Sequence, residues 1–389
     1  MPKSYEPSPE HPLTPACPYF PPEEQAWLQG ELREILNARL SMGPRVREFE
    51  GKFAAYCGTT FAVAVPSCSA ALELALLALG VEPGDEVLVP VETFVATGMA
   101  VHLVGARPLF TEIDRATLGM DFDDAWARVT PRTRGAIIVH FAGLIPPGLP
   151  AFVERMQASG RFVIEDAAHA PGAELNGTRA GSFGDAGCFS FFPTKIMTTA
   201  EGGMLVTSRP EVERVARSLQ NRGLDLEAGA ELYRVPGRNN RVSEIAAAMG
   251  LSQLRCLPGF LEQRRRVAKV YDDALVGDYA LCPIRPSPGS VSSYWRYPLI
   301  LDGRIDRKVL KEAAQEDGIS IDWPYDPLLH LQPVFRELLG TAPGLCPRSE
   351  HLLGRHICLP VHARMRECDA EYLVDRVRRH AARLLKERG

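Results

Sequence analysis

The chain has 389 residues, of which 46% are hydrophobic and 24% are charged, and this composition is typical of a globular protein rather than a disordered one. Lysine and arginine number 44 against 48 aspartate and glutamate residues, which gives a formal net charge of −4. This balance provides no general attraction to nucleic acid or to an anionic membrane surface. We therefore expect neither as a partner.

The sequence also lacks signals for a membrane or an export pathway. No apolar run approaches the roughly 18 residues that a membrane span needs, and the first residues lack a positively charged segment followed by an apolar one. We expect a cytoplasmic protein. The cysteines are scattered, without a Cys-x-x-Cys pair or a nearby histidine at metal-ligand spacing, which predicts free thiols and no metal site. They are Cys17, Cys57, Cys68, Cys188, Cys256, Cys282, Cys346, Cys358 and Cys368.

Residues 1–25 are rich in proline and predict an extended N-terminal arm. Helical spacing of apolar residues follows at 23–40 and again at 45–56. From about residue 60 to 207, short β-rich runs alternate with helical stretches, and several runs are apolar throughout, as strands covered by helices on both faces are. The expected strands are 61–65, 86–89, 107–110, 136–140, 162–166, 187–192 and 204–207, with helices at 69–79 and 96–104.

This alternation predicts an α/β domain with a largely parallel sheet, in which ligands bind beyond the carboxyl ends of the strands. Residues 242–275 are mostly helical in pattern, but Pro258 and Gly259 interrupt the pattern, and we place the boundary to a second domain there. Expected strands at 297–301 and 318–322 and helices at 308–316 and 371–386 follow. We predict an arm of residues 1–25, a large α/β domain of residues 26–257 and a small α+β domain of residues 258–389.

Small polar residues follow the first expected strand. Ser67, Cys68 and Ser69 lead into a helix, where backbone N–H groups and the helix dipole favour a phosphate group. A plain helix cap at Ser69 explains the same residues equally well. Phe94, after the next strand, is able to cover a flat ring.

Asp166 ends the strand expected at 162–166, and His169 follows three residues later. Taken alone, a strand-end aspartate is readily explained as the cap of a following helix. The same carboxylate is also able to keep a proton on a ligand's ring nitrogen.

Lys195 stands among phenylalanine, proline, isoleucine and methionine in a turn after another expected strand. Burial lowers the pKa of an amine and makes it a nucleophile toward an aldehyde, although a lysine in a loop can also extend to solvent. Ser190, just before this turn, is able to donate its hydroxyl to a phosphate. A phosphate cradle, a covering ring, a strand-end carboxylate and a sequestered lysine together match one cofactor, pyridoxal 5′-phosphate (PLP).

The ordered motifs resemble the DegT/DnrJ/EryC/StrS family of sugar aminotransferases over about residues 40–363. They are Val-Pro-Ser-Cys-Ser at 65–69, Val-Glu-Thr-Phe at 91–94, Ile-Glu-Asp-Ala-Ala-His at 164–169, Phe-Ser-Phe-Phe-Pro-Thr-Lys at 189–195, Glu-Gly-Gly at 201–203 and Gly-Arg-Asn-Asn-Arg at 237–241. The resemblance implies an α/β protein of the fold type I PLP-dependent transferases, with a large domain whose mainly parallel sheet lies between helices, and a smaller C-terminal α+β domain. It also implies a homodimer.

The resemblance implies two catalytic residues. Lys195 would form an internal aldimine with PLP, and Asp166 would keep the pyridine nitrogen protonated. Asn239 and Arg241 would reach the phosphate in the neighbouring subunit, so that each active site is composite. The complete set of implied cofactor contacts is Ser67, Cys68, Ser69, Phe94, Asp166, His169, Ser190, Lys195, Asn239 and Arg241.

Two residues depart from the family pattern, since Cys68 stands where glycine is usual and His169 where glutamine is more frequent. The presence of Lys195, rather than the histidine of the family's deoxygenating branch, favours amino transfer. We expect an aminotransferase that uses a pyridoxamine phosphate (PMP) intermediate to move an amino group from an amino acid, with glutamate as the expected donor, to a keto group of a nucleotide-linked sugar. Amination of a cyclitol or related ketone in antibiotic biosynthesis and a catalytically silent PLP-binding regulatory protein stay open as alternatives.

The sequence also contains a basic cluster, Arg264, Arg265 and Arg266. In a chain with a net negative charge, this cluster favours a solvated helix face over a nucleic-acid site.

Overall fold

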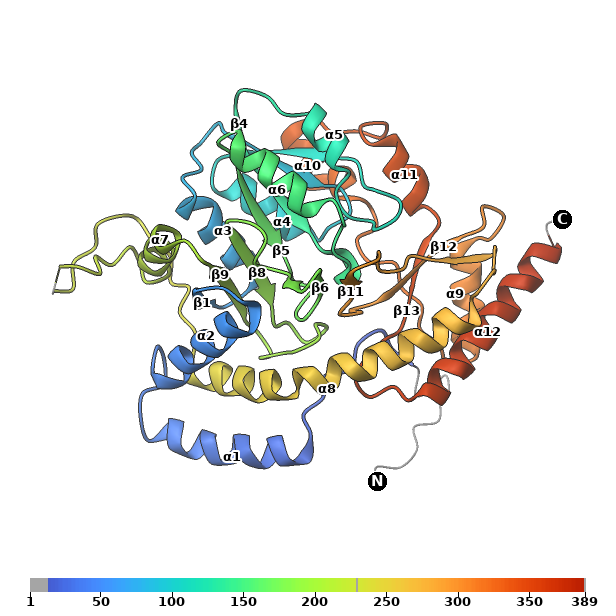
Figure 1. Cartoon of the computed structure of the whole chain (residues 1–389), viewed down its shortest axis with the longest axis horizontal. Helices are drawn as coiled ribbons and strands as arrows, with labels where there is room; N and C mark the ends of the chain where they lie inside the picture. Colours follow the sequence, from blue (N-terminus) through green and yellow to red (C-terminus); the bar gives the residue numbers. More distant parts are fainter. Residues whose placement is uncertain (1–12, 229, 388–389) are drawn as a thin grey trace.

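The protein is described from a computed structural model, which covers residues 13–228 and 230–387. Residues 1–12 of the predicted arm lie outside this part. The first described segment contacts the C-terminal part of the chain, because Leu13 pairs with Ile319 through a backbone bridge. Helix α1 (Pro22–Leu36) follows and lies beside the long helix α8 (Glu244–Ala274) (Figure 1).

A seven-stranded sheet forms the centre of the fold, in the order β1-β9-β8-β5-β4-β2-β3. Adjacent strands from β8 to β3 are parallel, whereas β9 is antiparallel to both β8 and β1. The expected strands of this region are therefore confirmed, with small shifts at their ends. Their bounds are β1 (Phe61–Val65), β2 (Glu86–Pro90), β3 (Arg107–Thr111), β4 (Thr133–Val139), β5 (Phe162–Asp166), β8 (Ala186–Ser190) and β9 (Gly203–Thr207).

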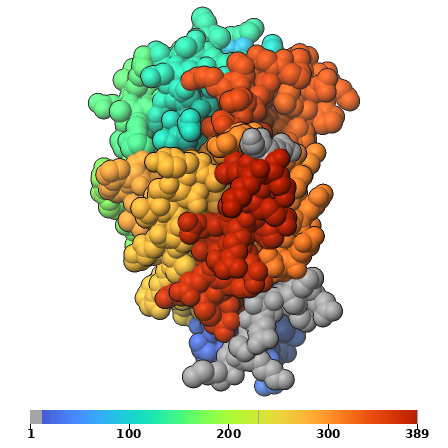
Figure 2. Space-filling model, turned by 90° about the vertical axis from the view of Figure 1, so that its right-hand side faces the viewer, coloured from blue at the N-terminus to red at the C-terminus, as the bar shows by residue number. Residues whose placement is uncertain are grey.

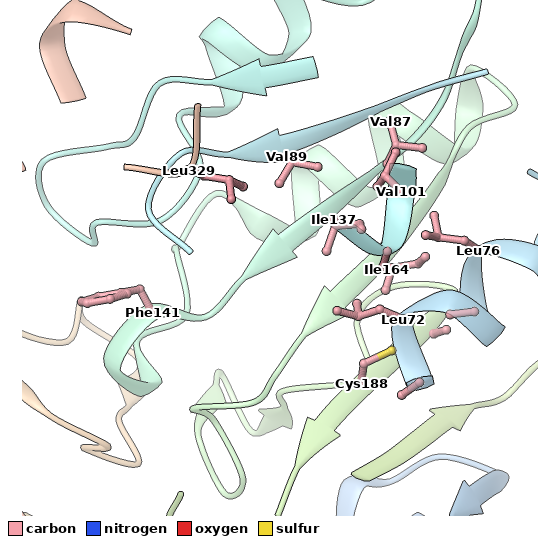
Figure 3. Packing of buried hydrophobic residues seen from close by; sticks show 14 of the residues in the cluster. Leu72, Leu76, Val87, Val89, Val101, Ile137, Phe141, Ile164, Cys188 and Leu329 are labelled. Carbon is pink, nitrogen blue, oxygen red and sulfur yellow. The ribbon is translucent and has the colours of Figure 1, made fainter. Parts of the chain in front are cut away.

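Helices cover both faces of this sheet, which is why its strands are apolar on both sides. One face packs against α3 (Cys68–Ala78), α4 (Val95–Leu103) and α7 (Pro210–Gln220). Figure 3 shows this layer, with Leu72 of α3 and Val101 of α4 beside Ile137 and Ile164 of the strands. The other face packs against α2 (Pro44–Cys57), α5 (Phe122–Ala127), α6 (Leu149–Ala158) and the first half of α8.

The C-terminal part contains a second, antiparallel sheet of β10 (Leu281–Pro283), β12 (Tyr297–Leu301) and β13 (His356–Leu359). The second half of α8, α9 (Arg307–Glu316) and α12 (Glu367–Glu387) pack with it around a separate apolar core. Figure 2 shows α12 along the surface beside α8. Shorter elements complete the chain: β6 (Glu174–Leu175), β7 (Thr178–Arg179), β11 (Ser290–Val291), η1 (Phe141–Gly143), η2 (Leu329–Leu331), α10 (Pro333–Leu339) and α11 (Pro347–Leu353).

The expected helix break at Pro258 and Gly259 is wrong, because α8 runs through both residues for 31 residues. A proline inside a helix removes one hydrogen bond at a cost of about 3 kcal/mol. Here Leu257 and Leu261 are buried on either side of it and offset that cost. The domain boundary at residues 257 and 258 stays a prediction. The apolar core that α8 contacts changes between Leu261 and Val267.

Two other expectations need correction. The segment 318–322 contains isolated bridges at Ile319 and Asp322 rather than a strand. Arg264 is buried rather than solvated, and its Nη1 donates hydrogen bonds to the carbonyl oxygens of Tyr294 and Val361.

All nine cysteines are free thiols. Among the helices of the described residues, none combines the length and the apolar composition that crossing a membrane requires.

Candidate active site

A cavity of about 420 Å³ opens at the carboxyl ends of the central strands, where ligands bind in sheets of this kind. The turns after β1, β2, β5 and β8 form one side of it, and Trp295 and Tyr325 from the C-terminal part form the other. The structure brings together all predicted site residues except Asn239 and Arg241. Those that line the cavity are Ser67, Cys68, Ser69, Phe94, Asp166, His169, Ser190 and Lys195.

Asp166 is the last residue of β5, and both of its carboxylate oxygens are held. Oδ2 accepts a hydrogen bond from Thr97 Oγ1 at 2.9 Å, and Thr97 is itself 2.7 Å from the hydroxyl of Thr93. Oδ1 accepts from the backbone N–H of Ala168 at 3.2 Å and lies 3.8 Å from Cys68 Sγ. Residues 167–173 form turns, so Asp166 does not cap a helix, and that alternative is wrong.

The neighbouring Glu165 fixes the strand from the opposite side, since successive side chains of a strand point to opposite faces. Its buried carboxylate accepts hydrogen bonds from His140 Nε2 and from three backbone N–H groups of the loop that precedes β8. Those loop residues are Gly181, Phe183 and Gly184. Asp166 is therefore placed by a strand that is anchored at its neighbouring residue.

Lys195 lies in the turn after β8, and its Nζ is 4.8 Å from the centroid of the Trp295 ring. The Trp295 indole in turn donates a hydrogen bond to the carbonyl of Thr194 at 2.8 Å, which fixes the turn to the C-terminal part. Burial lowers the pKa of Lys195 from 10.5 to about 8, although the negative charge of Asp166 opposes this change. At pH 7 about 10% of such amines are neutral and nucleophilic.

The start of α3 is where an anion cradle is predicted. Ser67, rather than Ser69, is its N-cap, because the Ser67 hydroxyl accepts a hydrogen bond from the N–H of Ala70. Strand β9 approaches this turn so closely that a Cβ on Gly203 would lie 2.6 Å from the amide nitrogen of Cys68. The Ser69 and Ser190 side chains line the same cavity. Hydroxyl groups and a helix N-terminus are the donors that a phosphate group requires.

His169 is stacked on Trp295, with the ring centroids 3.6 Å apart and an interplanar angle of 6°. Its Nε2 is 2.7 Å from the hydroxyl of Tyr325, whereas its buried Nδ1 has no hydrogen-bond partner in the structure. Burial, followed by the positive charges of Lys195 and Arg296, holds the pKa of His169 well below its usual value of 6.5. His169 is therefore neutral at physiological pH.

Asn239 and Arg241 do not line the cavity of their own chain. Both belong to the segment between α7 and α8, which projects from the body of the molecule (Figure 1). Within this chain Arg241 Nη1 donates to the side-chain oxygen of Asn221 at 2.8 Å. Their action on a neighbouring subunit stays a prediction.

The cavity also contains residues that sequence reasoning missed. Thr97 had a usable signal, since it lies one helical turn after Thr93 in the motif around Phe94. No local pattern marks the others, which come from a distant part of the chain and meet the sheet edge only in the folded structure. They are Trp295, Arg296, Asp322 and Tyr325.

These groups fit pyridoxal phosphate. Lys195 has an amine of lowered pKa for the aldehyde, Asp166 has a fixed carboxylate for the ring nitrogen, and the α3 turn has donors for the phosphate. The fold and the site together define a PLP-dependent transferase of fold type I.

The chain matches the model of the DegT/DnrJ/EryC1/StrS aminotransferase family over residues 22–378, and it belongs to this family. It is 37% identical to UDP-N-acetyl-3-dehydro-alpha-D-glucosamine 3-aminotransferase of Acidithiobacillus ferrooxidans, over 90% of this chain and 92% of the relative. It is 33% identical to dTDP-4-dehydro-2,3,6-trideoxy-D-glucose 4-aminotransferase of Saccharopolyspora spinosa, over 90% of this chain and 92% of the relative.

Solved structures agree with this assignment. The aminotransferase TlmJ from Streptoalloteichus hindustanus superposes with a TM-score of 0.88 at 32% sequence identity, and the match covers 96% of this chain and all of the other. The protein is thus a PLP-dependent aminotransferase.

Proposed function

We propose that this aminotransferase transfers an amino group from an amino acid, with glutamate as the expected donor, to a keto group of a nucleotide-linked sugar. The observation that carries the proposal is the Lys195 amine, which faces the same cavity as Asp166 and has a pKa of about 8. Relatives whose names specify UDP-linked and dTDP-linked sugars support this substrate class. Because these relatives differ in nucleotide and in the carbon that is aminated, neither feature is assigned to this chain.

The residues of the cavity would have different roles in the reaction. Pyridoxal phosphate, when bound, supplies a ring that accepts electrons from the substrate carbon next to the nitrogen. Lys195 would hold the cofactor covalently between turnovers, and its freed Nζ would move a proton between the substrate carbon and the cofactor carbon. Asp166, whose Oδ2 is fixed by Thr97, would keep a proton at the ring nitrogen.

Other side chains bind and orient the cofactor. Ser67, Ser69 and Ser190 would hold its phosphate, with Asn239 and Arg241 of the neighbouring subunit completing that site. Phe94, which is 55% exposed at the mouth of the cavity, would cover the ring and exclude water. His169 would donate a hydrogen bond to the ring hydroxyl from a neutral imidazole.

The test supplies the purified protein with [15N]glutamate and a panel of 3-keto and 4-keto sugars linked to UDP, dTDP or GDP, together with a keto-cyclitol. We expect mass spectrometry to find 15N in at least one nucleotide-linked product. The Lys195→Ala variant should form none, whereas the matched control Lys52→Ala, on the exposed face of α2, should behave like the wild type. If only the cyclitol is aminated, the sugar assignment is wrong and the cyclitol alternative is correct.

A further inference from the structure

One wall of the cavity contains an ion pair that the proposed chemistry does not use. Arg296 is 5% exposed, and its Nε donates to Asp322 Oδ2 at 3.1 Å. Nη1 donates to the carbonyl oxygens of Pro15 at 2.6 Å and of Trp295 at 3.1 Å. The guanidinium carbon also lies 4.2 Å from the centroid of the Trp295 ring. Three hydrogen bonds and a ring contact therefore fix this side chain in place.

The pair retains unused hydrogen-bonding capacity on both sides. Nη2 of Arg296 has no acceptor in the part of the chain that the structure describes. Within the described residues, the Asp322 carboxylate accepts from Arg296 alone. Its side chain is 29% exposed, and its buried Oδ1 has no hydrogen-bond partner there. A guanidinium has five N–H donors and a carboxylate about four acceptor positions, so a fixed donor and a spare acceptor stand side by side.

The charge of the pair limits what it can bind. Arg296 and Asp322 neutralise each other, so they provide little net attraction for a second carboxylate or a phosphate. A hydroxyl group has one O–H donor and also accepts hydrogen bonds through its oxygen, so it matches a donor next to an acceptor. The same wall carries the aromatic rings of Trp295 and Tyr325, against which the apolar face of a sugar ring can pack.

The pair also lies close to the reacting centre. Lys195 Nζ is 4.8 Å and the Arg296 guanidinium carbon 4.2 Å from the centroid of the same Trp295 ring. Lys195, Arg296 and Asp322 all line one cavity, so a sugar whose keto carbon lies near Lys195 shares that cavity with the pair.

We propose that Arg296 and Asp322 are specificity-determining residues that bind a hydroxyl group of the keto-sugar near the carbon that is aminated. This inference rests on the proposed function. The competing explanation is a purely structural ion pair, through which Arg296 fastens the segment at Pro15 to the cavity wall. The two explanations differ in whether the pair affects the choice between sugars.

The experiment measures kcat/KM for the best keto-sugar and for its analogues that each lack one ring hydroxyl. The wild type should prefer the parent sugar over one of these analogues by at least about tenfold, because that analogue leaves both polar groups unpaired. In Arg296→Met/Asp322→Leu, which removes both charges together, this preference should fall to about twofold or less. The matched control Arg379→Met/Asp375→Leu, an exposed pair on α12, should keep the full preference.

A second measurement separates specificity from folding. The reaction of the PLP-loaded enzyme with glutamate alone, followed by the loss of cofactor absorbance, involves no sugar and shows whether each double variant folds and binds the cofactor. The preference between sugars is a ratio of two kcat/KM values for one variant, so it does not depend on the rate of this first reaction. The Arg379/Asp375 control should react with glutamate at the wild-type rate. If the Arg296/Asp322 variant retains this reaction and still prefers the parent sugar tenfold, the pair is structural and the inference is wrong. It is equally wrong if the wild type does not discriminate against any of the analogues, a result that requires no variant. Failure of the wild type to aminate any nucleotide-linked sugar would instead overturn the proposed function.

Discussion

The amine of Lys195 differs from surface amines through its pKa of about 8, which burial lowers from 10.5. Only the neutral amine is a nucleophile, so its reactivity should rise as the pH rises through this value. We predict that acetylation of the cofactor-free protein, followed by peptide mass spectrometry, gives a midpoint near pH 8 for Lys195. Lys269 is an internal control, because Asp273 raises its pKa above 10.5. Equal midpoints for the two lysines would contradict the lowered pKa that burial gives to Lys195.

Asp166 is expected to act through its charge. Asp166→Asn keeps the size of the side chain but cannot hold a proton at the ring nitrogen, so we predict at least a 100-fold loss of kcat, about 3 kcal/mol in the barrier. The melting temperature should change little. Asp121→Ala is the control, since Asp121 caps α5 and loss of the cap should reduce stability by about 0.5–2 kcal/mol without affecting kcat. If Asp166→Asn has a nearly normal kcat and a lowered melting temperature, the catalytic role of Asp166 is wrong.

His169 is expected to contribute a neutral hydrogen-bond donor. His169→Gln should retain most of the PLP affinity of the wild type, whereas His169→Leu should lose at least about tenfold, because leucine has no donor. A fluorescence titration of the apoenzyme with PLP measures both. If glutamine and leucine give the same affinity, His169 only packs against Trp295.

Whether a site residue could be predicted from the sequence depends on how far along the chain it lies from the residues that it contacts. The sequence predicts Lys195, Asp166 and the Ser67 turn as site residues because each lies at or shortly after the carboxyl end of an apolar strand, and parallel strands bring these ends to one edge. Tyr325 and Trp295 were missed because their contact with His169 joins segments that are more than a hundred residues apart. Local spacing contains no information on such a contact.

At the scale of elements, β9 approaches the start of α3, where the phosphate cradle is predicted. A Cβ on Gly203 would lie 2.6 Å from the amide nitrogen of Cys68, so Gly203→Ala must displace the backbone of that turn. We predict a loss of about 1–3 kcal/mol in unfolding free energy and at least a tenfold weaker binding of PLP. Gly259→Ala in α8 is the control, because open space surrounds that position and alanine favours a helix by about 0.5–1 kcal/mol. Unchanged PLP affinity in Gly203→Ala would contradict the role of this close approach.

The sequence predicts helices and strands correctly where burial of apolar residues determines the local structure. The central strands are apolar on both faces and were placed to within a few residues, whereas α6, α7 and β13 were not predicted. The predicted break in α8 rests on Pro258 and Gly259, and the tertiary packing of both halves of the helix overrides that local signal.

At the scale of the whole molecule, the position of Asn239 and Arg241 outside their own cavity bears on the predicted composite active site. Co-expression of Lys195→Ala with Asn239→Ala chains tests it. In a mixed two-fold dimer, one site receives both substitutions and the other receives neither. With random pairing, activity should return to about a quarter of the wild-type value, although neither parent is active. If mixed dimers form and activity does not exceed that of the parents, the composite site is wrong.

The central claim is that Lys195 carries the cofactor of an aminotransferase, and borohydride reduction of the PLP-loaded protein tests it most directly. Reduction makes the bond between the cofactor and its lysine permanent, and digestion with peptide mass spectrometry then locates the modified residue. We predict the pyridoxyl group on Lys195, and its loss when the protein is first treated with glutamate, which transfers an amino group to the cofactor and frees the lysine. A stable label on a different lysine, with Lys195 unmodified, would contradict the account.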